Sequence, residues 1–529
     1  MSEVSCITPK MSSMNGATRN SYQPFSADNM GGACGWNSTE EPPSSFSTNN
    51  QQQSSKHTTS DDLLVRPTEA AADENASCHS SIAYKTNTNF RDYEDEDGRE
   101  RSTVLSTEGV VRVAAAHIIR LSDLVSNRHS EQATPLELLH LNLAGDDVRD
   151  VELASHLIDA AEKVSNRQLD RASSLLRQCF LLSSPAGNPV ERVVYHFSKG
   201  LEERIFRETG NGTSEASKET EITAANDVVN ATLGNHAVHL VAYRAIPFHQ
   251  LFHSLSVQAF LDNMASARRI HIVDFAIRHG LQWRILMQAL AARDACPVES
   301  LKISAVGSSV GAISAVGESL SSLAERLRLP FLFREVVLQD LKDLREDMFD
   351  LDEGEALGIS SHLVLNTLIV KPENVEKVMR VVRSLRPCVM VVMDVEANLN
   401  SPSFISRFTE ALFFFSAYFD CLHATMKRSG ESRRMIEEGF FSQIIKTVIA
   451  TEGSERVMRR VGVQVWRSFF TRFGLKETEL SERSKKQARY IIKKSFRDGS
   501  CMLERNGKAL LIEWKGTPLH FISAWKFQP

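Results

Sequence analysis

The feature that most constrains the fold is an alternation of short apolar runs with helix-like segments after residue 270. Five runs have the length and composition of buried strands: Ile270–Phe275, Leu301–Val306, Phe331–Leu338, Leu363–Leu368 and Cys388–Val395. Segments with helical spacing of apolar residues lie between several of them: Leu281–Arg293, Ala312–Leu329 and Glu373–Leu385. Apolar strands that alternate with helices are typical of a mainly parallel sheet covered on both faces. The sequence therefore predicts an α/β fold.

The C-terminal 30 residues predict an antiparallel addition to this sheet. Three strand-like pieces follow one another, Ser500–Arg505, Ala509–Trp514 and Leu519–Trp525. The first two are joined by Asn506-Gly507, and Asn-Gly between strands is a strong hairpin signal. A parallel sheet that ends in an antiparallel hairpin resembles the architecture of S-adenosylmethionine-dependent methyltransferases.

The chain before the sheet divides by composition into three parts. Residues 1–103 are rich in Ser, Thr, Asn and Gln and contain the acidic run Arg91–Glu100, so we expect a disordered, variable region. Residues 104–150 are expected to be a linker with one helix. Residues 151–529 are expected to form one ordered domain, with a helical cap at about 151–265 and the α/β core at about 266–529. The cap is predicted because apolar residues recur at helical spacing in three segments: Val151–Phe180, Pro189–Ile205 and His236–Met264. The polar insert Glu208–Asp227 lies between the second and the third of them.

Composition and short motifs exclude several classes of protein. The net charge of −5 argues against a uniformly basic coat for nucleic acid. The eight cysteines lack zinc spacing, which favours reduced thiols in an intracellular protein without a bound metal. The N-terminus has no apolar core of a signal peptide, and no apolar run is long enough to span a membrane.

The loop after the first strand bears on whether a cofactor binds. Nucleotide-binding loops carry repeated glycines so that the backbone can approach the ligand, but only Gly280 is present here, and Ile277 and Arg278 add bulk. Asp274 and Asp394 lie near strand ends and are expected to be structural. We therefore expect no cofactor and no catalytic residues.

Several short motifs resemble those of the plant GRAS family of transcriptional regulators. Ile270, His271, Ile272, Val273 and Asp274 resemble the family's V-H-I-I-D signature, with Gly280–Trp283 following as in the family. Ser523, Ala524 and Trp525 match the S-A-W motif near the C-terminus. The family's P-F-Y-R-E elements are similar to Pro387, Phe413–Asp420, and Arg434 with Glu437. The family's C-E-G-x-E-R motif is similar to Thr451–Arg456.

The resemblance implies a Rossmann-like core with an N-terminal helical cap and no established catalysis. It implies a nuclear regulator or co-regulator that works through other transcription factors, including other GRAS proteins, as a homo- or heterodimer. DNA contact, direct or indirect, is a separate hypothesis: the sequence has no zinc-finger or basic-zipper pattern, so such contact would depend on surface patches. Asp61–Val65 is only superficially similar to a D-E-L-L-A stretch, so we expect a member outside the DELLA branch; other features resemble members that regulate arbuscular mycorrhizal symbiosis. The alternative is a methyltransferase-like or other small-molecule-binding α/β protein.

A basic helix is predicted at Ser481–Phe496. Ala488, Ile491 and Ile492 fall on one side of a helical wheel. The opposite half holds seven basic residues: Arg483, Lys485, Lys486, Arg489, Lys493, Lys494 and Arg497. This half is either a solvated charged face or a contact for phosphates or an acidic partner, and in the second case Lys486, Lys493 and Lys494 are the candidate nucleic-acid contacts.

Overall fold

The computed structural model describes residues 105–126, 145–210, 246–426, 430–496 and 498–528. All of them belong to one compact unit, Lys56–Pro529. The region predicted to be disordered, 1–103, and most of the polar insert Glu208–Asp227 lie outside the described residues.

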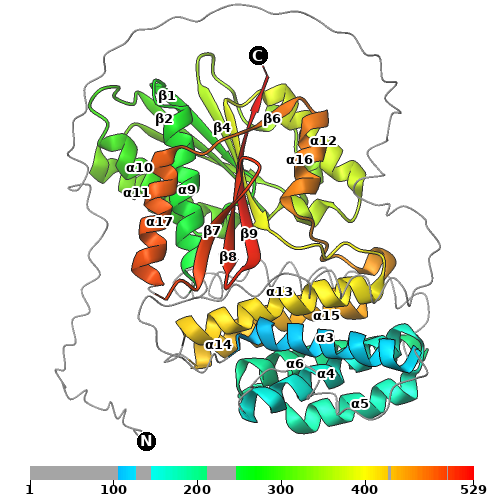
Figure 1. The fold of residues 1–529 in the computed structure, drawn as a ribbon. Helices are drawn as coiled ribbons and strands as arrows, with labels where there is room; N and C mark the ends of the chain where they lie inside the picture. Colours follow the sequence, from blue (N-terminus) through cyan, green and yellow to red (C-terminus); the bar gives the residue numbers. More distant parts are fainter. Residues whose placement is uncertain (1–104, 127–144, 211–245, 427–429, 497, 529) are drawn as a thin grey trace, which may run out of the picture. The chain divides into compact units, whose positions relative to one another are not determined.

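The described residues form a nine-stranded sheet with the order β3-β2-β1-β4-β5-β9-β8-β7, and β6 also pairs with β9 (Figure 1). The strands are β1 Arg269–Asp274, β2 Ser300–Gly307, β3 Phe331–Val337, β4 Ala356–His362, β5 Val389–Val395, β6 Leu475–Thr478, β7 Cys501–Asn506, β8 Ala509–Trp514 and β9 Thr517–Phe527. Strands β1 to β5 are parallel, and β9 runs antiparallel to β5. The predicted parallel sheet with an antiparallel C-terminal hairpin is therefore confirmed.

Helices cover both faces of the sheet (Figure 1). One face carries α9 Pro247–Asn263, α10 Leu281–Ala291, α11 Val310–Leu327 and α17 Glu482–Ser495, and the other carries α12 Pro372–Leu385 and α16 Val463–Arg472. The central strand β5 shows why helices are needed on both faces, because its side chains are apolar on each of them. Val389, Val391 and Met393 pack into the core on one face, whereas Met390 and Val392 pack into the core on the other.

A separate group of helices, here called the helical layer, is assembled from both halves of the chain. It contains α3 Thr107–Ser126, α4 Gly145–Ser165, α5 Leu169–Leu182, α6 Pro189–Glu208, α13 Phe404–Thr425, α14 Gly430–Ile436 and α15 Ser442–Ala450, with a π-helical turn at Glu437–Phe441. Helix α13 is buried around most of its circumference, because it touches α3, α6 and α15 on one side and β8 and β9 on the other.

The extent of the helical layer differs from the predicted cap at about 151–265. Helix α9 packs against β5, β9, α10 and α17, and therefore belongs to the cover of the sheet. Helix α3, which was expected in a linker, packs on α4 and α13. Sequence periodicity shows that a helix has an apolar side, but it does not show which element that side meets.

The prediction of a strand at Leu363–Leu368 was wrong. The strand is β4, Ala356–His362, and Leu365–Leu368 forms a 3-10 helical turn. Strand β4 was missed because it contains Gly358 and polar residues. The glycine is needed there, since a Cβ at this position would lie 2.5 Å from Met264 Cε and 2.8 Å from Phe260 Cε1 of α9.

Three further elements refine the sequence-based description. The helix predicted over Val151–Phe180 is divided between α4 and α5 at Arg167, whose φ is +56°. Helix α16 begins at Val463, and arginine side chains hold the preceding segment in a loop. The short strand β6 was not predicted, since its four residues carry too little apolar pattern to be recognised.

Candidate functional site

The carboxyl end of β1 is where ligands bind in many open α/β sheets, because the strand order reverses between β1 and β4. Asp274 is the last residue of β1, and its carboxylate accepts three hydrogen bonds. Oδ2 accepts from Trp283 Nε1 at 2.8 Å and from Gln282 Nε2 at 3.2 Å, and Oδ1 accepts from the backbone amide of Ala276 at 3.1 Å. Burial raises the pKa of Asp274 to about 6 even though these bonds oppose the shift. Asp274 thus ties the strand to the first turn of α10.

The loop after Asp274 does not fit a nucleotide. Its single glycine, Gly280, has φ +64°, and a Cβ there would lie 2.7 Å from Val316 Cγ1, so this glycine serves close packing against α11. Ile277 packs against the apolar core. Burial lowers the pKa of Arg278 to about 10, and the nearby carboxylates Asp274 and Asp394 oppose this shift. Side chains therefore occupy the position that glycines would leave open.

Asp394, near the end of β5, is likewise bonded within the protein. Its Oδ1 accepts from the backbone amide of Val395 at 2.7 Å and pairs with Arg460 Nη1 at 3.3 Å. Burial raises the pKa of Asp394, and the charge of Arg460 opposes this effect. Within the structure Asp394 holds Arg460, and with it the loop before α16, against the sheet.

His271 forms a buried polar tie across β1, β2 and the chain before β4. Its Nε2 lies 2.8 Å from Ser304 Oγ, and its Nδ1 lies 3.2 Å from Glu355 Oε2. Lys302 Nζ lies 3.0 Å from Glu355 Oε1 and 2.8 Å from Asp352 Oδ2. The serine, histidine and glutamate stand in the order of a hydrolytic triad, but all three are buried, so a substrate cannot reach Ser304.

The protonation of His271 follows from these contacts. Burial, and then the charge of Lys302, lowers its pKa to about 4, so the ring is neutral near pH 7. Since the Glu355 carboxylate only accepts, Nδ1–H donates to it and Nε2 accepts from Ser304. Ile270 and Ile272, on either side, point into the core on the opposite face, whereas Val273 packs with the core on the His271 side.

Among the residues similar to P-F-Y-R-E, Pro387 lies at the sheet, whereas Phe413–Asp420, Arg434 and Glu437 lie in the helical layer. Pro387 is buried between α12 and β5, following Arg386 in the left-handed conformation (φ +43°) that ends the helix. Glu437 is buried, and its Oε2 lies 3.0 Å from Arg192 Nε of α6, whereas Arg434 is exposed on α14. Sequence analysis missed Arg192, although an arginine within the apolar pattern of a helix is a signal for a buried ion pair.

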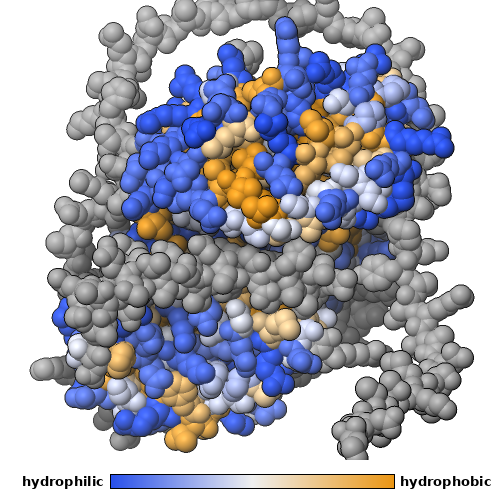
Figure 2. Space-filling model, turned by 180° about the vertical axis from the view of Figure 1, so that it is seen from behind, coloured by the Kyte–Doolittle hydropathy of each residue, from blue (hydrophilic) through white to orange (hydrophobic). Residues whose placement is uncertain are grey.

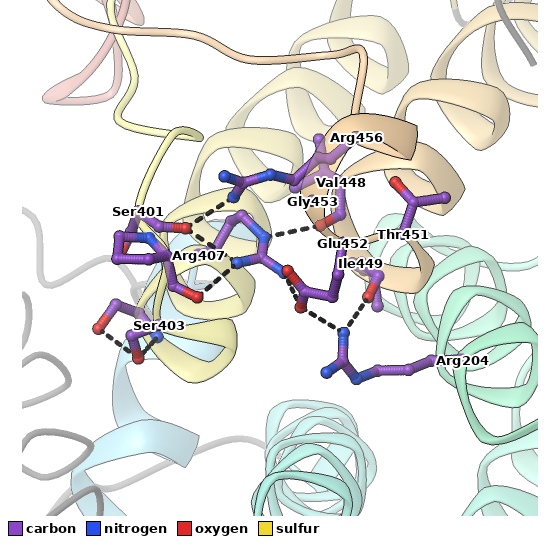
Figure 3. Close-up of polar contacts among 12 residues, drawn as sticks. Arg204, Ser401, Ser403, Arg407, Val448, Ile449, Thr451, Glu452, Gly453 and Arg456 are labelled. Carbon is purple, nitrogen blue, oxygen red and sulfur yellow. Dashed lines mark hydrogen bonds and ion pairs between the residues drawn. The ribbon is translucent and has the colours of Figure 1, made fainter. Parts of the chain in front are cut away.

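Figure 3 shows a group of arginines, here called the arginine joint, where the chain passes between the sheet and the helical layer. Arg407 of α13 donates from Nε to Val448 O at 2.9 Å, and Arg204 of α6 donates from Nη1 to Ile449 O at 3.1 Å. Both also reach Glu452 Oε1, at 2.5 Å and 2.8 Å respectively. These arginines satisfy the terminal carbonyls of α15, where positive charge is favoured.

Two more arginines complete the arginine joint. Arg456 Nη1 donates to Ser401 O at 2.7 Å, and Arg459 Nη2 donates to Gly453 O at 2.7 Å. Burial, together with the charges of Arg407 and Arg459, lowers the pKa of Arg456 to about 9. The segment from β5 into α13 is thereby fastened to the segment that leaves α15 for α16, and the motif at Thr451–Arg456 is the centre of this fastening.

The S-A-W residues lie inside the sheet. Ser523, Ala524 and Trp525 of β9 are buried and pair with residues of β5. Trp525 donates from Nε1 to Ser523 Oγ at 2.9 Å, and its ring packs edge-on to Phe470 with 5.0 Å between centroids. Trp525 lies in the interior of the sheet, because β9 lies between β5 and the strands β6 and β8.

Helix α17 confirms part of the predicted basic half. Lys486, Lys493 and Lys494 are exposed. Lys485 was assigned wrongly: it is buried, and its Nζ lies 2.8 Å from both Glu479 Oε1 and Glu482 Oε1. Arg497 lies outside the described residues.

Metal sites and membrane spans are both absent from the described part of the chain. It contains no group of three or more histidine, cysteine, aspartate or glutamate side chains placed to hold a metal ion. Its helices include none that is both long and apolar enough to cross a bilayer.

These features define a class of protein: a Rossmann-like α/β core, closed at its usual nucleotide position by its own side chains and joined to a helical layer. The chain belongs to the GRAS domain family, whose model matches residues 153–526. The sequence is 30% identical over 377 residues to the DELLA protein RGL1 of Arabidopsis thaliana, covering 71% of this chain and 70% of that protein. It is 28% identical to the DELLA protein GAI1 of Vitis vinifera, covering 75% of this chain and 64% of that protein.

A solved structure agrees with this assignment. The structure of SCL7 in Oryza sativa aligns with a TM-score of 0.61 and 26% identity, covering 71% of this chain and 99% of that one. The matched region spans about two thirds of the DELLA relatives' length. The expectation that the chain lies outside the DELLA branch, among members that regulate mycorrhizal symbiosis, stays a prediction.

Proposed function

We propose that this chain is a nuclear transcriptional regulator or co-regulator that works by binding other transcription factors, including other GRAS proteins, through its helical layer. The proposal rests on family membership and on apolar surface in that layer, part of which is visible at the bottom of Figure 2. Leu181 and Leu182 at the end of α5 are 83% and 44% exposed, and Phe206 of α6 is 50% exposed. Apolar side chains exposed on amphipathic helices are suited to packing against a partner helix.

Point substitutions test this proposal with little risk to folding. We expect Leu181→Asp with Phe206→Asp to weaken homo- or heterodimer formation at least tenfold, because each change places a charge where apolar contact is needed. Val310→Asp is the matched control, since Val310 is 57% exposed on α11 of the core. Sedimentation of the full chain, alone and with a purified GRAS partner, gives the affinities. Equal association of all three proteins would contradict the proposal.

DNA contact is a second part of the proposal, carried by the exposed lysines of α17. Lys486, Lys493 and Lys494 come from one helix and lie on its solvent side, where phosphates could reach them. The competing function, a methyltransferase-like small-molecule binder, is disfavoured by the closed loop after Asp274. Titration calorimetry with S-adenosylmethionine distinguishes the two, because measurable binding heat would favour the competing function.

A further inference from the structure

The solvent side of α17 carries concentrated positive charge. Lys486, Arg489, Lys493 and Lys494 are exposed, and these four residues are here called the basic face. Within the described residues, Lys486, Lys493 and Lys494 have no ion-pair partner within 4.0 Å. The first-turn carboxylate of α17, Glu482, is paired with the buried Lys485 instead. A chain with an overall charge of −5 thus presents four neighbouring cations on one helix.

Helix α3 begins beside the C-terminal end of α17. Thr107, the first residue of α3, donates from Oγ1 to Asp420 Oδ1 at 3.2 Å. Asp420 Oδ2 accepts from Trp514 Nε1 at 2.7 Å, and the Trp514 ring packs against Phe496, directly after α17, with 5.3 Å between centroids. The start of α3 is therefore fixed close to the end of α17 that carries Lys493 and Lys494.

The segment that precedes α3 has the complementary charge. Arg91–Glu100 contains six carboxylates and two arginines, which leave a net charge of −4. This segment lies outside the described residues and ends seven residues before Thr107. The described chain begins at Leu105, so the five residues from Glu100 to Leu105 span at most about 18 Å, and the ten residues Arg91–Glu100 span at most about 36 Å more. The 14 residues of α17 extend for about 21 Å. The acidic segment is therefore tethered within reach of the whole basic face.

We propose that the acidic segment Arg91–Glu100 docks on the basic face of α17 in the same chain and masks it. The tether makes the contact intramolecular, with an effective concentration on the order of millimolar. Several neighbouring pairs of opposite charge form a network, which holds better than an isolated surface pair and weakens as salt is added. An external polyanion then has to displace the acidic segment before it can occupy the basic face. The docking itself does not depend on DNA being that polyanion.

Zero-length carbodiimide crosslinking of the full chain tests the docking directly, because this reagent joins carboxylates to lysine amines in contact. Mass spectrometry of the monomer fraction should find Arg91–Glu100 joined to Lys486, Lys493 or Lys494, and high salt should remove these links. An absence of such links at low salt overturns the proposal. Mixing isotopically light and heavy chains identifies links between two copies, and links found only there also overturn it.

Lysine acetylation rates give a second measure that does not require a crosslink. The variant Glu94→Gln, Asp95→Asn, Glu96→Gln and Asp97→Asn should acetylate Lys486, Lys493 and Lys494 at least threefold faster than the unchanged chain. Lys371 and Lys377, exposed at the opposite face of the sheet around α12, serve as internal controls whose rates should not change. Unchanged rates at all five lysines would show that the basic face is not masked. If the unchanged chain does not bind DNA, the crosslinking and acetylation results still test the docking. The absence of DNA binding would count only against the proposed function.

Discussion

Arg192 and Glu437 are 245 residues apart in sequence and form a buried ion pair, with 3.0 Å between Arg192 Nε and Glu437 Oε2. The two side chains are 0% and 1% exposed. Arg192 also donates from Nη1 to Gly187 O at 2.7 Å, at the start of its own helix. The pair joins α6 to the π-helical turn before α15, so the early and late parts of the helical layer meet at one charged contact.

The Arg192–Glu437 pair predicts an asymmetric response to mutation. Arg192→Met should lower the free energy of unfolding by about 3–5 kcal/mol, because it leaves the Glu437 carboxylate buried without its partner. Combining Arg192→Met with Glu437→Met should recover a large part of this loss, because the uncompensated charge is gone. Urea unfolding of the full chain measures both. A double variant that is less stable than the single one would show that the pair itself supplies net stability.

Trp525→Ala should lower the free energy of unfolding by about 3–5 kcal/mol, because a large buried aromatic is lost from the interior of the sheet and leaves a cavity beside Phe470. The measurement is again urea unfolding, with partner affinity determined for the same sample. Trp525→Phe is the control, since it keeps most of the apolar volume. A Trp525→Ala protein of unchanged stability that no longer associates would place Trp525 at an interface and contradict its assigned structural role.

The His271 tie predicts a loss of stability in acid. The pKa of His271 is about 4 in the folded state, against 6.5 for the free side chain. Below pH 6.5 the unfolded chain therefore takes up a proton that the folded chain does not, and stability falls until about pH 4 is reached. The contribution over this window is about 3 kcal/mol. His196 and His249 shift in the same direction, so His271→Gln should reduce the pH dependence without abolishing it.

This pH prediction is checked by urea unfolding at several values between pH 7 and pH 4.5. The groups around His271 that also carry charge are Glu355, Lys302, Asp352 and Arg334. Lys302→Gln is a useful companion, because it removes a positive charge that depresses the pKa of His271. Its stability should fall less steeply below pH 6.5 than that of the unchanged chain. Parallel curves for all three proteins would contradict the assignment.

The basic face predicts salt-dependent DNA affinity. Lys486→Gln, Lys493→Gln and Lys494→Gln together should flatten the dependence of log affinity on log salt, by a slope of about 0.9 for each phosphate that is no longer neutralised. The fold should be unaffected, because all three side chains are exposed. The matched control is Lys371→Gln, Lys377→Gln and Lys476→Gln, three exposed lysines elsewhere. If variant and control show equal slopes of log affinity against log salt, the three lysines do not contact phosphates. The basic face is then a solvated charged surface.

Regular apolar pattern made most of the sheet predictable. The strands β1, β2 and β5 are mostly apolar because helices cover both of their faces, and the C-terminal hairpin was marked by Asn506-Gly507. Strand β4 was not predictable in the same way. Its surface is fitted to α9 at Gly358, and its polar residues Ser360 and Ser361 are buried by neighbours that periodicity cannot identify.

The structural roles of Asp274 and Asp394 could be anticipated from the sequence, but their partners could not. The Trp283 partner of Asp274 lies only nine residues away and is fixed by the strand-turn-helix. Arg460, by contrast, reaches Asp394 across 66 residues, and Arg192 reaches Glu437 across 245. Long-range pairs of charged residues depend on how whole helices dock, and one sequence with many arginines offers many equivalent pairings.

The arginine joint has a consequence for how this protein can be taken apart experimentally. The chain leaves the sheet after β5, builds α13 to α15, and returns to the sheet at α16, with Arg407 and Arg456 fastening the outward and returning segments. No single cleavage point in the sequence separates the helical layer from the sheet, so a truncation series removes parts of both. A truncated fragment can therefore lose partner binding because its core is exposed and incomplete. It can equally lose partner binding because the binding surface has been removed. Binding sites on this protein are therefore best located by surface substitutions in the intact chain.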